Sequence, residues 1–165
     1  MNAPLVRVGQ GWDLHRLVEG GPLRLGGVDI PHDRRAEGHS DGDAALHALT
    51  DAILGAAGAG DIGTHFRDDD PRWRGADSAL FLREAVRLVR AQGLDIGSAD
   101  VIVILERPKL APHRAAIVER IAAVLGVPEQ VVSVKAKTNE GLGVIGRGEA
   151  IAALVIVGLV AAIGD

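Results

Sequence analysis

Two separate segments of the chain carry residues that could bind a metal ion. Asp13 and His15 lie two positions apart in a glycine-containing segment, and His47 lies in an alanine- and leucine-rich segment. Residues two apart on a strand face the same side, so this pair could offer a carboxylate oxygen and an imidazole nitrogen to one ion. With His47 they make three ligands, which leaves a fourth tetrahedral position for substrate, as in catalytic zinc sites.

Each of these residues also has an ordinary structural explanation. An Asp-x-His pair in a loop is more often a solvated turn, because aspartate readily bonds to turn backbone. A histidine at the edge of an apolar helix face is more often a core residue bonded to a neighbouring carbonyl group. The metal-site hypothesis therefore requires the two segments to meet in the fold.

The elements that would position these residues follow from the patterning. Residues 5–15 are expected to be extended, and a helix is expected from about Asp43 to between Gly55 and Gly60, with Ser40 as its N-cap. Residues 23–28 are expected to form a second strand, broken by two glycines, that pairs with the first as a hairpin. The expected apolar face of the helix consists of Ala45, Leu46, Leu49, Ala52, Ile53 and Ala56.

The second half of the chain reads as further helices and strands. Residues 78–91 predict an amphipathic helix to which we assign only a structural role, and residues 113–125 predict another helix. Residues 101–105 and 131–137 predict strands. The expected apolar side of the helix over 78–91 contains Leu80, Phe81, Ala85, Leu88 and Val89.

Three polar loops could contact a substrate. In the loop 61–71 we favour Asp61 for substrate hydroxyls and regard most of the three aspartates at 68–70 as solvated. The proline-bracketed loop 106–112 could present rigid backbone groups to a flat ligand, or could simply connect two elements. The glycine-rich loop 138–149 could bind phosphate and a hard divalent cation through Glu140, or could hold an ordinary Arg147–Glu149 ion pair.

Composition limits the class of protein. The 165 residues suit one domain, 1–165, and the absence of cysteine excludes thiolate metal ligands and disulfides. A net charge of -4, from 18 basic and 22 acidic residues, argues against a nucleic-acid partner. The N-terminus has no secretory pattern, so we expect a soluble, cytoplasmic protein without a membrane partner.

The apolar run 150–163 predicts association between copies of the chain. It has 14 apolar residues, too few for a spanning helix, which needs about 20. Its β-branched residues favour a strand, and a strand without alternation is buried on both faces. One face can pack on the chain's own helices, so we expect the other to meet further copies around a central axis.

Taken together, these segments resemble the 2-C-methyl-D-erythritol 2,4-cyclodiphosphate synthases of the non-mevalonate isoprenoid pathway, from about Val6 to Val160. The segments that carry the resemblance are 9–15, 39–51, 60–63, 108–109 and 135–149. The resemblance implies an α+β fold with a mixed, mostly antiparallel sheet that helices cover on one face. It also implies a homotrimer with the sheets inside and the active sites at subunit boundaries.

The resemblance also implies the reaction and the roles of residues. In the reaction, 4-diphosphocytidyl-2-C-methyl-D-erythritol 2-phosphate cyclises with release of CMP. Asp13, His15 and His47 would hold Zn²⁺, Glu140 would hold Mg²⁺ or Mn²⁺, and His39 and Thr138 would stabilise the transition state. The substrate-binding residues would be Ser40, Asp61, Ile62, Gly63, Phe66, Asp68, Asp70, Leu105, Pro108, Lys109, Leu110, Ala111, Ala136, Lys137, Asn139, Val144 and Arg147.

Several positions depart from the family pattern. Lys137, Asn139 and Arg67 differ from residues that are common at these positions, which should tune binding more than chemistry. Val144 stands where the family often has a phenylalanine facing the central cavity, so an aromatic contact to an isoprenoid diphosphate is in doubt, although Arg147 could still bind such an anion.

Two other functions remain open from the residues. One is a zinc-dependent phosphohydrolase that attacks a nucleotide with water and gives an acyclic product. The other is a non-catalytic nucleotide-binding module with a structural zinc ion, which needs a fourth protein ligand, either His39 or Asp43.

Overall fold

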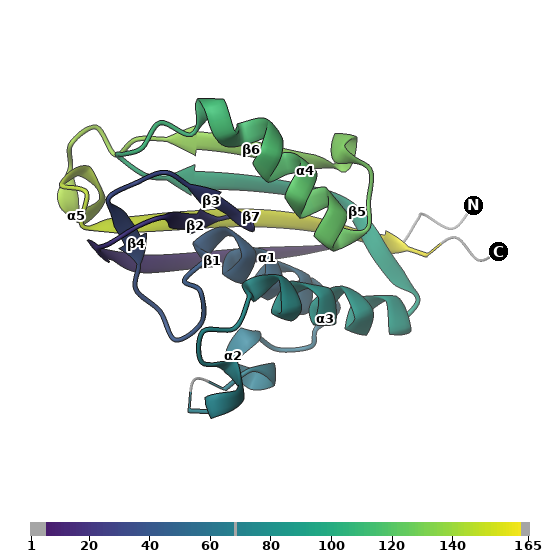
Figure 1. Ribbon diagram of the computed structural model, residues 1–165. Coiled ribbons are helices and arrows are strands. Elements are labelled where there is room, and N and C mark those ends of the chain that lie inside the picture. The colour runs from purple at the N-terminus through teal and green to yellow at the C-terminus, as the bar shows by residue number, and fades with distance from the viewer. Residues whose placement is uncertain (1–5, 68, 163–165) are drawn as a thin grey trace.

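The computed structural model, which describes residues 6–67 and 69–162, has a twisted sheet with helices packed against it (Figure 1). Five strands form the main sheet in the order β4-β1-β7-β5-β6, and β2 and β3 form a separate ribbon. The strands are β1 (Val6–Glu19), β2 (Leu23–Leu25), β3 (Val28–Ile30), β4 (Arg34–Ala36), β5 (Leu94–Ile104), β6 (Val132–Lys137) and β7 (Ala150–Ala161). The helices are α1 (Ala44–Ala57), α2 (Ile62–His65), α3 (Ser78–Ala91), α4 (Arg114–Leu125) and α5 (Gly143–Gly146), with 3-10 turns at Pro71–Trp73, Ala111–His113 and Glu129–Val131.

Strand pairing confirms the predicted mixed, mostly antiparallel sheet. Only β5 and β6 run parallel, while β1 pairs antiparallel with β4 and β7, and β5 pairs antiparallel with β7. The register of β1 and β7 runs from Val6 opposite Val160 to Arg16 opposite Ala150. The centre of the sheet is therefore built from the first and last strands of the described chain.

Two glycines let α1 lie directly against β1. A Cβ atom added at Gly9 or Gly11 would come within 1.9 Å of a backbone carbonyl oxygen of α1. Any side chain at these two positions would push the helix away from the strand. Because side chains alternate along a strand, Asp13 and His15 continue the same face of β1, toward α1. The close approach thus brings the strand residues within reach of the helix that carries His47.

The start of α1 differs from the prediction. Asp43 is the N-cap, and its carboxylate accepts a hydrogen bond from the backbone N–H of Leu46 at 3.0 Å. The prediction that Ser40 caps the helix was wrong, because the Ser40 hydroxyl lies 2.9 Å from Nε2 of His47. The expected helix and its buried apolar positions are otherwise present.

The predicted hairpin between residues 23–28 and the first strand was also wrong. Residues 23–25 pair with residues 28–30, and β1 takes β4 and β7 as its partners instead. The helix predicted over 78–91 is confirmed as α3, although Leu80 is 49% exposed and does not share the buried side.

The sheet face turned away from the helices, here called the open face, carries exposed apolar side chains. The exposed fractions are 68% for Val8, 58% for Trp12 and 48% for Ile156, and Leu14 is also exposed. In the single chain, β7 is therefore buried on its helix-covered face but only partly on the open face. In the part of the chain that the structure describes, no helix has the length and apolar character needed to cross a membrane.

Candidate metal centre

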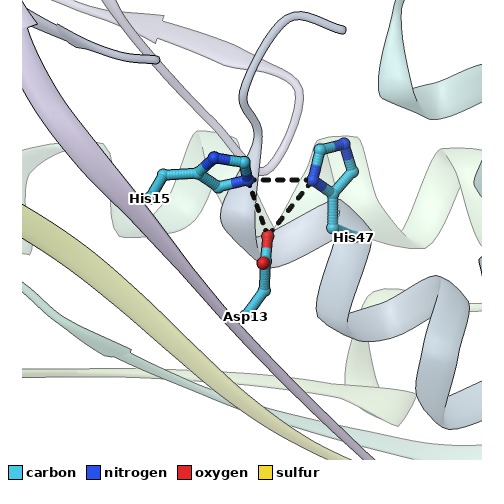
Figure 2. Close-up of side chains that lie close together, drawn as sticks. All are labelled: Asp13, His15 and His47. Atoms are coloured by element: carbon cyan, nitrogen blue, oxygen red, sulfur yellow. Dashed lines mark hydrogen bonds and ion pairs between the residues drawn. The ribbon is translucent and has the colours of Figure 1, made fainter. Parts of the chain in front are cut away.

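Asp13, His15 and His47 converge beneath α1 (Figure 2). Asp13 Oδ2 lies 2.8 Å from His15 Nε2 and 3.1 Å from His47 Nδ1, and the two nitrogens are 3.1 Å apart. Zinc bonds of 2.0–2.1 Å in a tetrahedral arrangement would separate ligand atoms by about 3.3 Å. The three atoms already lie close to that separation, so a small expansion would fit the ion.

Hydrogen bonds at the far side of each imidazole ring orient the two histidines. Nδ1 of His15 lies 2.8 Å from the carbonyl oxygen of Glu37, which can only accept a hydrogen bond, so Nδ1 is the donor and Nε2 of neutral His15 presents its lone pair to the cluster. Nε2 of His47 lies 2.7 Å from the Ser78 hydroxyl and 2.9 Å from the Ser40 hydroxyl. Lone pairs of neutral rings and a carboxylate oxygen thus face one point, as a bound cation requires.

The charges of this cluster are strongly coupled without a metal ion. Burial would raise the pKa of Asp13, but hydrogen bonds and charge from His15 and His47 outweigh it and hold that pKa far below its usual value. Burial would lower the pKa of His15, but the Asp13 carboxylate raises it above 6.5. A proton on His15 would therefore compete with a metal ion for this position.

A cavity of about 260 Å³ opens beside the three ligands. Its wall gathers several residues predicted from sequence, as well as Asp51 and Phe81, which were not predicted. The lining residues are Asp13, His15, His39, Ser40, His47, Asp51, Ile62, Phe66 and Phe81. The cavity therefore joins metal ligands, hydroxyl and imidazole groups, and an aromatic wall in one space.

Ile62, the first residue of α2, and Phe66, just after its end, line the outer side of the cavity, and the predicted residues Asp61, Gly63 and Asp70 lie beside it. Asp61 caps α2 and accepts hydrogen bonds from the backbone N–H and hydroxyl of Thr64 at 2.8 and 2.7 Å. Gly63 lies in the first turn of α2 and is exposed. Asp70 caps the following 3-10 turn and pairs with Arg72. Asp68, predicted to contact substrate, lies outside the described residues.

Asp51 ties this wall to α1. Its carboxylate accepts a hydrogen bond from the Ile62 backbone N–H at 2.7 Å. Its pKa is raised, mainly by burial and also by the charges of Asp61 and Asp13, although the bond from Ile62 opposes this shift. Asp51 lies one helical turn after His47 in the predicted helix, but nothing in the neighbouring sequence distinguished it from an ordinary helix residue.

Several other predicted substrate residues line different cavities. Pro108, Lys109 and Thr138 share a cavity of about 710 Å³ with Arg107 and neighbouring residues. A smaller apolar cavity of about 160 Å³ is lined by Leu110, Ala111, Arg114, Ile117, Val134 and Ala136. Within one chain, the predicted site residues thus divide into a metal side and a β5–β6 side.

On the β5–β6 side, the loop after β6 is internally bonded. The Thr138 hydroxyl donates to the Glu140 carboxylate at 2.9 Å, and Glu140 adopts a positive φ of 52°. Asn139 donates its backbone N–H to Glu106 at 3.2 Å, and the exposed Lys137 accepts the Leu105 N–H at its backbone oxygen. Both groups predicted to meet phosphate and the second cation are therefore exposed and close together.

The two positions discussed for an isoprenoid anion lie apart from the metal cavity. Val144 is 45% exposed beside Leu14 and Arg16, in a cavity that reaches the open face. Arg147 pairs with Glu149 at 2.9 and 3.0 Å, as the ordinary ion-pair alternative stated. Its guanidinium is therefore already paired in the single chain.

The structure weakens the structural-zinc alternative. Asp43, one of its two candidate fourth ligands, is buried and accepts backbone N–H groups from Gly26 at 2.9 Å, Gly27 at 2.6 Å and Leu46 at 3.0 Å. His39 lines the cavity, but the metal-ligand cluster among residues 6–67 and 69–162 has three members, Asp13, His15 and His47. The arrangement leaves a ligand position facing the cavity.

Comparison with known proteins identifies the family. The model of the YgbB family matches residues 6–160, almost the whole chain. The chain belongs to the YgbB family. One relative is 2-C-methyl-D-erythritol 2,4-cyclodiphosphate synthase from Ralstonia nicotianae. It is 58% identical over 153 residues, which cover 93% of this chain and 91% of that protein.

Solved structures agree with this YgbB assignment. A 2C-methyl-D-erythritol-2,4-cyclodiphosphate synthase in its CDP-bound form has a TM-score of 0.86 and 49% identity, covering 93% of this chain and 99% of that one. The bifunctional IspDF from Campylobacter jejuni has a TM-score of 0.92 and 41% identity, covering 96% of this chain. The chain spans only 43% of that bifunctional protein.

Proposed function

We propose that this protein is a 2-C-methyl-D-erythritol 2,4-cyclodiphosphate synthase of isoprenoid biosynthesis. It converts 4-diphosphocytidyl-2-C-methyl-D-erythritol 2-phosphate into the cyclic diphosphate and CMP. The convergence of Asp13, His15 and His47 in one cavity, in a chain 58% identical to a synthase of this name, is the observation that carries the proposal. The 2-phosphate oxygen forms a bond to the β-phosphorus as the bond from that phosphorus to CMP breaks.

The chemistry makes modest demands on the protein. The nucleophile is already an anion and CMP is an adequate leaving group, so the site must align the two phosphates and neutralise charge. We assign no general base. We assign His39 and Ser40, which line the cavity, to phosphate contacts, and Asp61, Ile62 and Gly63, in and beside the first turn of α2, to the methylerythritol hydroxyls.

Two cations complete the proposal. Two imidazole nitrogens and one carboxylate oxygen suit Zn²⁺, and the exposed Glu140 carboxylate suits Mg²⁺ or Mn²⁺. When bound, such ions supply Lewis-acid polarisation of phosphate oxygens. The Thr138 hydroxyl, 2.9 Å from Glu140, would turn to a phosphate oxygen when the carboxylate takes its cation.

We further propose a homotrimer in which each site is shared. The exposed apolar side chains of the open face support this assembly, because exposed patches of this kind mark protein interfaces. A neighbouring copy packed on the open face would cover these apolar groups.

Assembly would also unite the two groups of site residues. The β5–β6 side of one copy, with Leu105, Pro108, Lys109, Ala111 and Ala136, would form the cytidine pocket beside the metal cavity of its neighbour. The relative solved with CDP shows that a cytidine diphosphate binds to a protein of this fold.

Product analysis tests the reaction directly. Purified protein with bound zinc and added Mg²⁺ is expected to convert the substrate into CMP and a cyclic diphosphate, identified by phosphorus NMR. An acyclic phosphate product would instead indicate the phosphohydrolase, and no turnover would overturn the proposal.

A second test removes one of the three metal ligands. The variant His47→Ala is expected to lose zinc, measured by metal analysis, and to lose cyclisation by at least about 10³-fold, as losses of catalytic electrostatic groups do. Full activity in this variant would contradict the assignment of the metal site.

A further inference from the structure

Ser78, the first residue of α3, is a buried polar residue at the back of the metal cluster. It is 0% exposed, and α3 was expected to have no part in the site. Its hydroxyl oxygen lies 2.7 Å from Nε2 of His47, on the side of the ring opposite Asp13 and His15. The contact joins residues 31 positions apart, so the fold has placed a hydroxyl against the outer nitrogen of a metal-binding ring.

The Ser78 hydroxyl proton is committed to another partner. The hydroxyl donates to Asp41 Oδ1, and the Ser78 backbone N–H donates to Asp41 Oδ2 at 3.1 Å. Arg24 Nε lies 3.7 Å from Oδ2 of the same carboxylate. A charged carboxylate only accepts hydrogen bonds, so the single Ser78 hydroxyl proton points to Asp41.

This arrangement determines which nitrogen of His47 carries the proton. Because the Ser78 hydroxyl proton is used, its oxygen can interact with His47 Nε2 only by accepting a hydrogen bond. Nε2 must then carry a proton, which leaves Nδ1 as the ring nitrogen that can give its lone pair to a metal ion held with Asp13 and His15. Histidines that bind metals generally donate their other N–H to such a partner.

The Ser40 hydroxyl does not determine which nitrogen of His47 carries the proton. Its hydroxyl lies 2.9 Å from His47 Nε2, but its only other side-chain partner among the described residues is the Ser78 hydroxyl at 3.5 Å. A hydroxyl without a charged acceptor can rotate to donate or to accept. Ser40 also lines the cavity, where it could turn to a phosphate, while Ser78 is fully enclosed.

We propose that Asp41 and Ser78 are positioning residues that hold His47 in the tautomer with Nδ1 free for the metal ion. This inference rests on the proposed metal site. The order of contacts runs from the Asp41 carboxylate through the Ser78 hydroxyl to the His47 ring. Neither Asp41 nor Ser78 touches substrate in this assignment, so their effect acts through metal affinity.

Zinc affinity provides the main test. We would measure Zn²⁺ binding to the metal-free protein by competition with a chromophoric chelator, without substrate. Loss of the partner of a ligating histidine should weaken Ser78→Ala binding about 10- to 100-fold. The matched control Ser40→Ala should keep nearly wild-type zinc affinity and instead raise KM for the substrate.

A spectroscopic measurement on the wild type does not depend on any variant folding. Long-range proton–nitrogen NMR of the zinc-loaded protein should show His47 bound to the ion through Nδ1, with its proton on Nε2. In Ser78→Ala, the spectrum should move toward a mixture of the two ring orientations. A wild-type ring bound to zinc through Nε2 would overturn the proposal.

The outcomes separate this inference from the proposed function. If wild type binds no zinc, the metal site fails and this inference fails with it. If wild type binds zinc and Ser78→Ala, shown to be folded by circular dichroism, binds equally well, only the positioning role is overturned. A Ser78→Ala protein that unfolds at lower temperature but retains zinc affinity would likewise leave Ser78 a purely structural residue.

Discussion

At the residue scale, each histidine of the metal cluster is oriented by a hydrogen bond that points away from the metal position. Glu37 holds the ring of His15 through a backbone carbonyl group, and Ser78 contacts the ring of His47. The two strand residues could be chosen from the sequence, because spacing along a strand fixes their common face. Their outer partners could not, since Ser78 becomes relevant only when α3 packs beside α1.

Protonation of the cluster leads to a prediction about pH. The pKa of His15 is raised above 6.5, so its stabilisation of the metal-free fold is fully present below about pH 6.5 and is lost as pH rises through the raised value. The pKa of Asp13 is depressed, so its contribution is present above about pH 3.9 and is lost below it. In chelator-treated protein, the Asp13–His15 pair should therefore add most to the free energy of unfolding between about pH 3.9 and 6.5. Denaturant unfolding at several pH values would measure this.

Zinc binding should depend on pH in the opposite direction. Below the raised pKa of His15 a proton competes with the ion, so apparent zinc affinity should fall about tenfold per pH unit. A zinc affinity that is independent of pH between 5 and 7 would contradict the protonation of His15.

A second prediction concerns Asp51, which sequence reasoning did not select. Asp51→Ala removes the acceptor for the Ile62 N–H and frees the wall that α2 forms beside the cavity. We expect KM for the substrate to rise about tenfold, corresponding to the loss of roughly 1.4 kcal/mol of binding, with zinc content unchanged. Equal KM values for variant and wild type, from initial-rate measurements, would show that this bond does not position the substrate wall.

At the element scale, long periodic segments were predictable and short pairing segments were not. The helix over 78–91 and the strands around residues 13, 103 and 134 follow from periodicity and apolar runs. The three-residue strands β2, β3 and β4 carry too few positions for a pattern, and their partners depend on the chain around them. The wrong hairpin and the wrong N-cap both came from giving a local pattern priority over such distant partners.

The contact between α1 and β1 yields a matched pair of glycine variants. Gly11→Ala would bring a methyl group within 1.9 Å of the Ala48 carbonyl oxygen, so the helix must shift. We expect the free energy of unfolding to fall by roughly 1–3 kcal/mol, as in overpacked cores, and zinc affinity to fall because His47 moves with α1.

The control variant lies on the exposed side of the same helix. At Gly55 an added methyl group meets no atom within 4 Å, so Gly55→Ala should stabilise the protein by about 0.4–1 kcal/mol. Denaturant unfolding of both variants measures the difference. Equal stability for the two would show that α1 tolerates displacement from β1.

At the scale of the whole molecule, the open face leads to a prediction about assembly. Trp12 is 58% exposed there, and Trp12→Glu would place a charge in the proposed trimer interface. An unpaired buried charge is strongly destabilising, so we expect monomers in light scattering and loss of activity, because each site would lack its neighbour's cytidine pocket.

Leu80→Glu is the control, since Leu80 is 49% exposed on α3, away from the open face. This variant should keep the wild-type mass and activity. A monomeric wild-type protein with full activity would contradict the shared site.

The pairing of β1 with β7 has a consequence for biosynthesis. Asp13 and His15 sit opposite Ala153 and Ile151, so the strand that displays them gains its longest partner only after residues 150–161 have been synthesised. Contacts between such distant parts of a chain form late, because closing the intervening loop costs entropy. A nascent polypeptide that lacks residues 150–161 would thus leave its imidazoles unarranged, and capture of a metal ion would wait until this segment has been synthesised.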